Sequence, residues 1–464
     1  MSDLPSTVHP FAINGVIPSL AVKADLGPPR SETGIGALMP WADRLWMVTY
    51  PSNRGSGSGT GLFEIRDDFS MTKRPESVVG TYANRLIHSP SNQLLIGPHV
   101  IDAAGNVRTA EALVPHRLTA TMEHLEHPES MVYVLSMEGP MWELDVATLA
   151  VRELFDVNRE LGVEYPPGTQ PHYKGGHTGQ GRVVVANNTF FLSDWTGRTA
   201  LGRLGEWDGR EWRVLDRTAF NEVAGRRNMG QVIFATGWDR TSAILYALVE
   251  GQWQRYRLPK ASHTWEQCWQ TEWPRIREVE TERYLMDASG MFYELSPVAF
   301  GGRVWGVKPI CQHLRIIPDY CSWNGLLVLA GNQTTPNADC NLVVGQPQAG
   351  LWFGKTDDLW SWGRPAGWGG VWWDTPVTAG EPSDPFLMTG FEGKCLHLTH
   401  DADQTVRFVV EVDFLGDGSW RRYDRFDVKA GRYRHHEFPG GFSAHWVRVT
   451  PRADCTATAF FTYT

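Results

Sequence analysis

Seven times along this sequence, an apolar run typical of a β-strand is followed, after a turn, by a second run. The first runs are Leu45–Val48, Leu94–Ile96, Val132–Leu135, Val183–Ala186, Ala243–Val249, Arg283–Met286 and Leu326–Ala330. The second runs, often rich in aromatic residues, include Gly61–Ile65, Met141–Val146, Thr189–Leu192, Gln252–Leu258, Met291–Leu295 and Gly350–Phe353. The first runs begin about 47 residues apart on average, which is a typical period of four-stranded propeller blades. We therefore expect a seven-bladed β-propeller, with loops that converge on one central depression.

Turn-forming residues separate these runs along the whole sequence. The chain contains 47 Gly and 29 Pro among its 464 residues, and turn signals recur roughly every 8–12 positions. No long segment keeps the helical spacing of apolar residues, and the best short helix candidate is Asn158–Gly162. The expected fold class is all-β, with little helix.

The pattern changes near residue 380. A stretch rich in Gly, Pro and Trp (363–385) is followed by short alternating runs that are typical of a small β-sandwich. We predict a ligand-binding propeller in residues 1–383 and a C-terminal sandwich in residues 386–464. Two segments are candidates for closing the last blade: part of the Gly/Pro/Trp stretch, or a strand from the first 30 or so residues.

Charge and hydropathy exclude several classes of protein. The net charge of −9 argues against general nucleic-acid binding, which favours a basic surface. No run of 18 apolar residues exists, so we expect no membrane span. The start of the sequence lacks the features of a signal peptide, which predicts a cytoplasmic protein, or an exported one if a leader was removed. The oligomeric state stays open.

The cysteines are too sparse for a disulfide scaffold. None forms a CxxC pair, and we expect mostly buried thiols. The alternative for an exported protein is a Cys311–Cys321 or a Cys321–Cys340 bridge.

A first cluster of polar residues occupies a Gly-rich segment, 172–188, which we interpret as a loop at the axis end of the fourth apolar run. Glycines let a backbone turn sharply and approach a ligand closely. Five polar side chains lie between or beside these glycines: His172, Lys174, His177, Gln180 and Arg182. We predict that His177 is catalytic and that the other four bind substrate. The structural alternative is a long connection with solvated polar residues.

A second cluster, in residues 258–277, mixes charged and aromatic side chains. Flat aromatic faces beside hydrogen-bonding groups suit a sugar, whose ring stacks while its hydroxyls find polar partners. The candidates here are the proton-transferring residue His263, the alternative acid Glu272, and the binding residues Lys260, Trp265 and Arg275. The alternative is a loop whose tryptophans fill the space between blades.

Three further candidates lie between the two clusters. Trp238 and Asp239 precede the fifth apolar run, and Asp239 is either a turn cap or a pocket carboxylate. Arg227, beside Arg226, is a candidate for binding an anionic group.

Four segments carry a resemblance to a known family: KGGHTGQGR (174–182), LPKASHT (258–264), TEWPRIRE (271–278) and GFSAHWVRV (441–449). With them the whole chain resembles a bacterial family of propeller proteins with a C-terminal sandwich, a family of unestablished activity. In architecture it is similar to seven-bladed propeller carbohydrate enzymes, such as ulvan and oligogalacturonate lyases and enzymes that cleave rhamnosyl–glucuronate linkages. Several of those enzymes rely on histidine together with basic residues. No motif of theirs maps residue by residue onto this chain, so the resemblance implies no catalytic position.

Two functions follow as expectations. The first is cleavage of glycosidic bonds in an oligo- or polysaccharide, often anionic, in the central pocket. In β-elimination, Lys260 and Arg275 would neutralise a carboxylate while His263 or His177 removes a proton. In hydrolysis, Glu272 or Asp239 would act with a second carboxylate. The alternative is a non-catalytic carbohydrate-binding or interaction propeller. No cofactor or metal is predicted, although a divalent cation such as calcium is compatible with either function.

Overall fold

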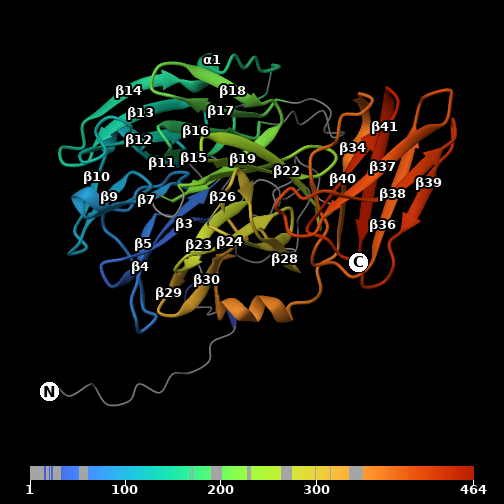
Figure 1. The fold of residues 1–464 in the computed structure, drawn as a ribbon. Coiled ribbons are helices and arrows are strands. Elements are labelled where there is room, and N and C mark those ends of the chain that lie inside the picture. The colour runs from blue at the N-terminus through green and yellow to red at the C-terminus, as the bar shows by residue number, and fades with distance from the viewer. Residues whose placement is uncertain are drawn as a thin grey trace.

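The protein is described by a computed structural model that covers most of the chain (Figure 1). The described residues are 15–16, 20, 22–23, 33–51, 61–167, 169, 171–189, 201–226, 231–262, 274–297, 299–313, 315–333 and 348–464. Nearly all regular structure among them is β-strand, as the sequence predicts. The helices are the short α1 (Val157–Glu160) and the 3-10 turns Ser89–Ser91, Glu111–Leu113 and Thr356–Ser361. No helix in these ranges is long and apolar enough to cross a membrane.

The first part of the chain folds into a series of antiparallel sheets, most of them four-stranded, in which consecutive strands are neighbours. The first three sheets contain β3 (Thr33–Trp41), β4 (Arg44–Pro51), β5 (Leu62–Ile65) and β6 (Met71–Lys73); β7 (Arg85–His88), β8 (Gln93–Ile96), β9 (His99–Asp102) and β10 (Val107–Thr109); and β11 (Leu118–Glu123), β12 (Met131–Ser136), β13 (Pro140–Asp145) and β14 (Val151–Asp156). The next three contain β15 (Tyr173–Gly179), β16 (Arg182–Asn187), β17 (Arg203–Trp207) and β18 (Trp212–Asp216); β19 (Ala219–Gly225), β20 (Ile233–Trp238), β21 (Ala243–Val249) and β22 (Gln252–Leu258); and β23 (Arg275–Glu280), β24 (Arg283–Ala288), β25 (Met291–Leu295) and β28 (Val307–Gln312). Short pairings add β31 (Asn332–Gln333) to β3, β2 (Val22–Lys23) to β32 (Gln348–Ala349), and β26 (Ala299–Phe300) to β27 (Arg303–Val304).

The sheet that follows in the chain is completed by an N-terminal strand. It contains β29 (Tyr320–Trp323), β30 (Leu326–Ala330) and β33 (Leu351–Gly354), and its outer strand is β1 (Gly15–Val16). Gly15 pairs with Phe353 and Val16 with Trp352. Of the two closures considered from the sequence, the structure has the one in which the N-terminal segment supplies the closing strand.

The sheets are arranged around a common axis (Figure 1). The first strand of each contacts the first strands of its two neighbours, in the closed order β3, β7, β11, β15, β19, β23, β29 and back to β3. A closed ring of antiparallel sheets is the arrangement of a β-propeller. The ring surrounds a channel that is lined by these first strands.

The apolar runs that reveal the repeat are second strands, not the strands at the axis. Leu45–Val48 lies in β4 and Val132–Leu135 in β12, and both runs are fully buried. Second strands are covered on both faces by neighbouring sheets and are therefore continuously apolar, whereas first strands face the channel. The fifth sheet is an exception, because the apolar run Ala243–Val249 is its third strand, β21, and not its second. The predicted partner Thr189–Leu192 is not a strand within its described part; the third strand there is β17.

The C-terminal residues form two further sets of paired strands. One sheet has the order β34 (Gly367–Val377), β41 (Cys455–Tyr463), β36 (Lys394–His400) and β39 (Arg434–Glu437). The other has the order β35 (Phe386–Leu387), β40 (Trp446–Pro451), β37 (Val406–Asp413) and β38 (Arg421–Val428), and it continues from the outer edge of β22. The rings of Phe386 and Phe461, one from each sheet, stack with centroids 5.0 Å apart. Because β34 pairs with β41, these sheets begin at residue 367, inside the stretch that we expected to precede them.

Apolar packing joins the C-terminal sheets to the propeller. One continuous core contains Phe234 of β20, Met286 of β24 and Val410 of β37. The ring of Tyr256 on β22 lies 4.7 Å from that of Trp446 on β40. The C-terminal sheets therefore rest on the fifth and sixth sheets of the ring.

Two of the cysteines proposed for bridges are free thiols. Cys311 and Cys321 are both buried, and burial raises the pKa of each to about 12. This fits the expectation of buried thiols for these two and removes the Cys311–Cys321 bridge, whereas Cys395 and Cys455 are only partly buried. Cys340 lies outside the described residues.

Candidate functional site

The candidate site is a cavity of about 300 Å³ at the centre of the ring. Side chains and backbone from β3, β7, β11, β15, β19 and β23 line it, with Tyr284 reaching in from β24. Its charged residues come from four of these strands and comprise four cations and two carboxylates. They are Arg85, Lys174, Glu222, Arg275, Arg277 and Glu278.

The Gly-rich segment that we predicted to be a loop is the strand β15, which lines this cavity. Glycine is required there because first strands crowd together near the axis. A Cβ on Gly175 would lie 2.9 Å from the backbone N of Val223 and 3.0 Å from the carbonyl O of Asn221, both on β19. The glycines thus allow close approach of two strands, and the side chains between them, Lys174 and His177, reach the cavity.

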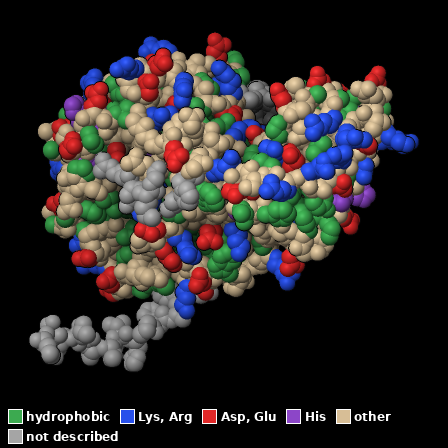
Figure 2. Space-filling model, viewed as in Figure 1, with side chains coloured by type: hydrophobic (Ala, Val, Ile, Leu, Met, Phe, Trp, Pro, Cys, Tyr) green, Lys and Arg blue, Asp and Glu red, His purple; other side chains and the backbone are tan. Residues whose placement is uncertain are grey.

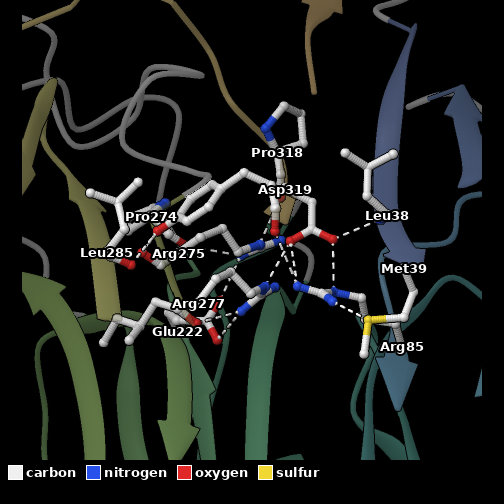
Figure 3. Close-up of polar contacts among 12 residues, drawn as sticks. Leu38, Met39, Arg85, Glu222, Pro274, Arg275, Arg277, Leu285, Pro318 and Asp319 are labelled. Carbon is white, nitrogen blue, oxygen red and sulfur yellow. Dashed lines mark hydrogen bonds and ion pairs between the residues drawn. The ribbon is translucent and has the colours of Figure 1, made fainter. Parts of the chain in front are cut away.

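A buried ion network crosses the ring from β19 and β23 to β3 and β7 (Figure 3). Asp319, just before β29, pairs with Nε of Arg85 at 2.9 Å and with Nε of Arg277 at 2.7 Å. Glu222 on β19 pairs with Arg275 and with Arg277, each at 3.2 Å. The backbone N–H of Leu38 on β3 donates to Asp319 at 2.7 Å. The network therefore joins four first strands, β3, β7, β19 and β23, to the residue just before a fifth, β29.

The network favours the charged forms of Asp319 and Arg277. Burial alone would raise the pKa of Asp319, but Arg277, Arg85 and the Leu38 N–H hold that pKa below its usual range. Burial would lower the pKa of Arg277, but Asp319 and Glu222 outweigh it and raise that pKa. Three guanidiniums face two carboxylates, so the network carries a net positive charge.

His177 is a neutral histidine that faces the cavity. It is half-buried, and burial lowers its pKa to about 4, so the imidazole is uncharged at neutral pH. Its Nε2 lies against Gly225, where a Cβ would come within 2.5 Å. Within the described part of the chain, its ring nitrogens have no hydrogen-bond partner. A neutral imidazole of this kind is able to accept a proton.

Tyr284 and Glu278 lie beside each other on the cavity wall. They are cross-strand partners on β24 and β23, and Arg226 pairs with Glu278 at 3.4 Å. Burial, and then the nearby Glu278, raise the pKa of Tyr284, so its hydroxyl stays protonated. The cavity thus contains a neutral base, a protonated hydroxyl and several cations.

Three other candidates from the first cluster lie away from the cavity lining. The Nδ1 of His172 contacts Oδ1 of Asn188. Gln180, in the β15–β16 turn, donates from Nε2 to the carbonyl O of Gln231 at 2.7 Å. Arg182 pairs with Glu206 at 3.3 Å. These side chains hold strand ends and turns together, which is the structural alternative stated for this cluster.

Trp238, Asp239 and Lys260 lie where the fifth sheet meets the C-terminal sheets, not at the axis. Asp239 accepts hydrogen bonds from the N–H groups of Thr241 and Ser242, as a turn cap does, and pairs with Arg257 at 2.7 Å. Burial alone would raise the pKa of Asp239, but the positive charges of Arg257 and Lys260 hold that pKa below its usual range. Lys260 lies over the ring of Trp368 on β34, and Trp238 is buried.

Four candidates lie outside the described residues: Arg227, His263, Trp265 and Glu272. Their roles stay predictions. Of the candidates that are described, the structure brings Lys174, His177 and Arg275 to one cavity, from two clusters about 100 residues apart in the sequence.

Sequence reasoning missed Arg85, Glu222 and Asp319. None of the three lies in the polar segments 172–188 and 258–277 that we singled out. A detectable signal is their position, because Arg85 and Glu222, like Lys174, lie on the strand just before a buried apolar second strand. Aligning the repeats on the second strands places these residues at the axis.

Comparisons with known proteins add only a distant likeness. No family model matches this sequence, and no curated protein matches it. The chain is similar in structure to "Structure of U3-55K", at 10% identity and a TM-score of 0.41, covering 71% of this chain and 98% of that one. It is also similar to "Crystal structure of RRP9 WD40 repeats", at 10% identity and a TM-score of 0.41, covering 74% and 99%.

Proposed function

We propose that this protein binds an acidic oligosaccharide in the central cavity and cleaves it by β-elimination. The observation that carries the proposal is the neutral His177, whose ring has no described partner, in the same cavity as Lys174, Arg275 and Arg277. Cations at a cavity wall attract and neutralise a carboxylate, which makes the neighbouring C–H bond more acidic. A neutral imidazole then suits removal of that proton.

The elimination balances with groups of this cavity. His177 takes the proton from the carbon next to the uronate carboxylate, and that electron pair forms a carbon–carbon double bond. The bond from the adjacent carbon to the glycosidic oxygen breaks, and the leaving oxygen receives a proton. The hydroxyl of Tyr284 is the proposed donor, because its raised pKa keeps it protonated until the leaving group develops charge.

Hydrolysis fits this cavity less well. It requires one protonated carboxyl and a second carboxylate on opposite sides of the bond. Glu222 and Asp319 are each held by two arginines, and Glu278 is held by Arg226. Among the described residues, each of these carboxylates is thus engaged with arginine, and we find no second carboxyl placed opposite a free one, as hydrolysis requires.

A non-catalytic binding or interaction propeller is the second candidate. The observation that favours it is the ion network, which joins residues of five sheets and suits a rigid scaffold. In that case the channel supports the ring and no bond is cleaved.

We extend the proposal to the domain architecture: seven blades, closed by β1, followed by a two-sheet sandwich. The closed ring of first strands and the stacked rings of Phe386 and Phe461 between the C-terminal sheets support it. Limited proteolysis that releases a stable fragment beginning near residue 367 would support a separate propeller and sandwich. Proteolysis that yields no stable fragment beginning there would contradict this division.

The test is turnover on uronate polymers. Wild-type protein would be incubated with polygalacturonate, polymannuronate and glucuronate-containing polysaccharides, and the ultraviolet absorbance of the conjugated product would be followed. We expect His177→Ala to lose at least about a hundredfold in rate, the usual scale of general acid–base catalysis. His397→Ala, on β36 of the C-terminal sheets, is the matched control and should retain full activity. Binding of these polymers without turnover by wild type would support the non-catalytic candidate instead.

A further inference from the structure

A second candidate site lies on the outer face of the C-terminal sheets. A cavity of about 580 Å³ is lined there by residues of β37, β38 and the β40–β41 turn. We name it the arginine groove, and its polar residues are Gln404, Thr405, Arg407, Arg422, Arg425, Asp427 and Arg452. In Figure 2 Lys and Arg side chains gather over the region where β37 and β38 lie in Figure 1.

The strand register builds this groove. Arg407 lies opposite Asp427, and Val409 opposite Arg425, so these side chains project from the outer face while Phe408 and Phe426 enter the core. Val409 forms the floor: it is on the outer face yet only 5% exposed. We attribute its burial to the aliphatic stems of the arginines beside it, which lie along apolar surface.

The groove has more guanidinium groups than its carboxylate neutralises. Arg407 is bound in a two-point contact by Asp427, at 2.7 and 2.9 Å. Among the described residues, the guanidiniums of Arg422, Arg425 and Arg452 have no ion pair or hydrogen bond. Four cations thus face one carboxylate, in a chain whose net charge is −9.

The chemistry of the groove selects an oxyanion. Guanidinium presents a planar set of N–H donors that matches carboxylate, sulfate or phosphate oxygens in two-point contacts. Successive outward residues on one strand are about 7 Å apart, so the arginines are spaced to meet a series of anionic groups rather than one. Gln404 and Thr405 at the rim add groups that hydrogen-bond hydroxyls.

We infer that the arginine groove binds an acidic polysaccharide, through carboxylates or sulfates carried on successive sugars. Nucleic acid is the less suited polyanion, because the groove lining contains no aromatic side chain on which bases stack. The inference deepens the proposed function: it rests on the proposed acidic-polysaccharide substrate and would place a second, non-catalytic contact with that polymer on the C-terminal sheets.

The test is a direct binding measurement with the full-length chain. Titrations would use polygalacturonate and dextran sulfate, with neutral dextran as the uncharged control and oligothymidylate as the nucleic-acid probe. The groove variant is Arg422→Gln/Arg425→Gln/Arg452→Gln. Its matched control is Arg159→Gln/Arg210→Gln/Arg283→Gln, which removes the same charge from exposed positions on the propeller. Circular dichroism and thermal unfolding would establish that each variant is folded.

We expect the groove variant to bind at least one of the two acidic polymers at least tenfold more weakly than wild type. The affinity of the control variant should change at most twofold. Added salt should weaken the binding of the polymer by wild type. Equal affinity of the groove variant and wild type for both acidic polymers would overturn the inference. Tighter binding of oligothymidylate than of either polysaccharide, lost in the groove variant, would also overturn it. The variant His177→Ala, titrated with the same polymers, separates the two proposals. If it loses turnover but still binds the polymers as wild type does, the loss is specific to the central cavity and leaves the arginine groove untouched.

Discussion

Substituting Asp319 with Asn tests whether the ion network stabilises the ring. The change keeps the size of the side chain but removes the charge that faces Arg85 and Arg277, both within 2.9 Å. Removing one partner of a buried ion pair costs about 3–5 kcal/mol, because the remaining charge is left buried. Asn keeps an acceptor oxygen, and Arg277 keeps Glu222. We therefore expect Asp319→Asn to lower the free energy of unfolding by about 3 kcal/mol, the lower end of this range, which is roughly a hundredfold change in the unfolding equilibrium constant.

The assay is urea unfolding followed by tryptophan fluorescence at several pH values. The pKa of Asp319 is lowered in the folded protein, so its contribution is present above the unfolded pKa of about 3.9 and is lost as the pH falls through the folded value. The difference between wild type and Asp319→Asn should accordingly be full at pH 7 and shrink below about pH 4.

A matched control is available on the surface. Asp427 also pairs with an arginine, Arg407, but both side chains are about half exposed. Asp427→Asn should change stability little, because solvent screens an exposed pair. The reasoning on the network would be refuted if Asp319→Asn lost less than about 1 kcal/mol at pH 7, or if its deficit were the same at pH 7 and pH 3.5.

Three further predictions concern single positions. If His177 is the base, kcat/KM for elimination should keep its value down to about pH 4 and fall below it; an acid limb near pH 6.5 would point to another histidine. Gly175→Ala should lower the free energy of unfolding by about 1–3 kcal/mol, because its Cβ meets the backbone of β19, whereas Gly440→Ala, with open space around it, should be neutral in the same urea titration. Cys321 should resist a thiol reagent at pH 8 in the native protein and react after unfolding, because burial raises its pKa to about 12; rapid native labelling would contradict its buried position.

The fold was largely accessible from the sequence because second strands are covered on both faces. That burial makes runs such as Val183–Ala186 continuously apolar, and their period reveals the repeat. The phase was harder to read, since first strands such as β15 carry glycine and polar residues and resemble loops. In the fifth sheet, β20 ends in Thr-Gly-Trp, so the more apolar β21 was taken as the marker of the repeat.

The candidate site was accessible only in part. Lys174, His177 and Arg275 stand in the two polar segments that we singled out, but Arg85, Glu222 and Asp319 lie outside them, and their partners are more than 40 residues away in the sequence. Their meaning comes from the ring, which brings separate repeats together at the axis. Asp239 was left open between a turn cap and a pocket carboxylate, and the structure has the turn cap, beside Arg257.

The pairing of β1 with β33 has a consequence for how the protein is made. Gly15 is synthesised roughly 340 residues before its partner Phe353, an interval of about 20 to 70 seconds at usual rates of translation. Throughout that time the ring is open, and the strand that completes it has no place to bind. Once β33 is made, its outer edge is unpaired until β1 docks, and such an edge can pair with another chain. The nascent protein therefore has a window in which a chaperone, or a neighbouring copy on the same polysome, competes with its own N-terminal segment.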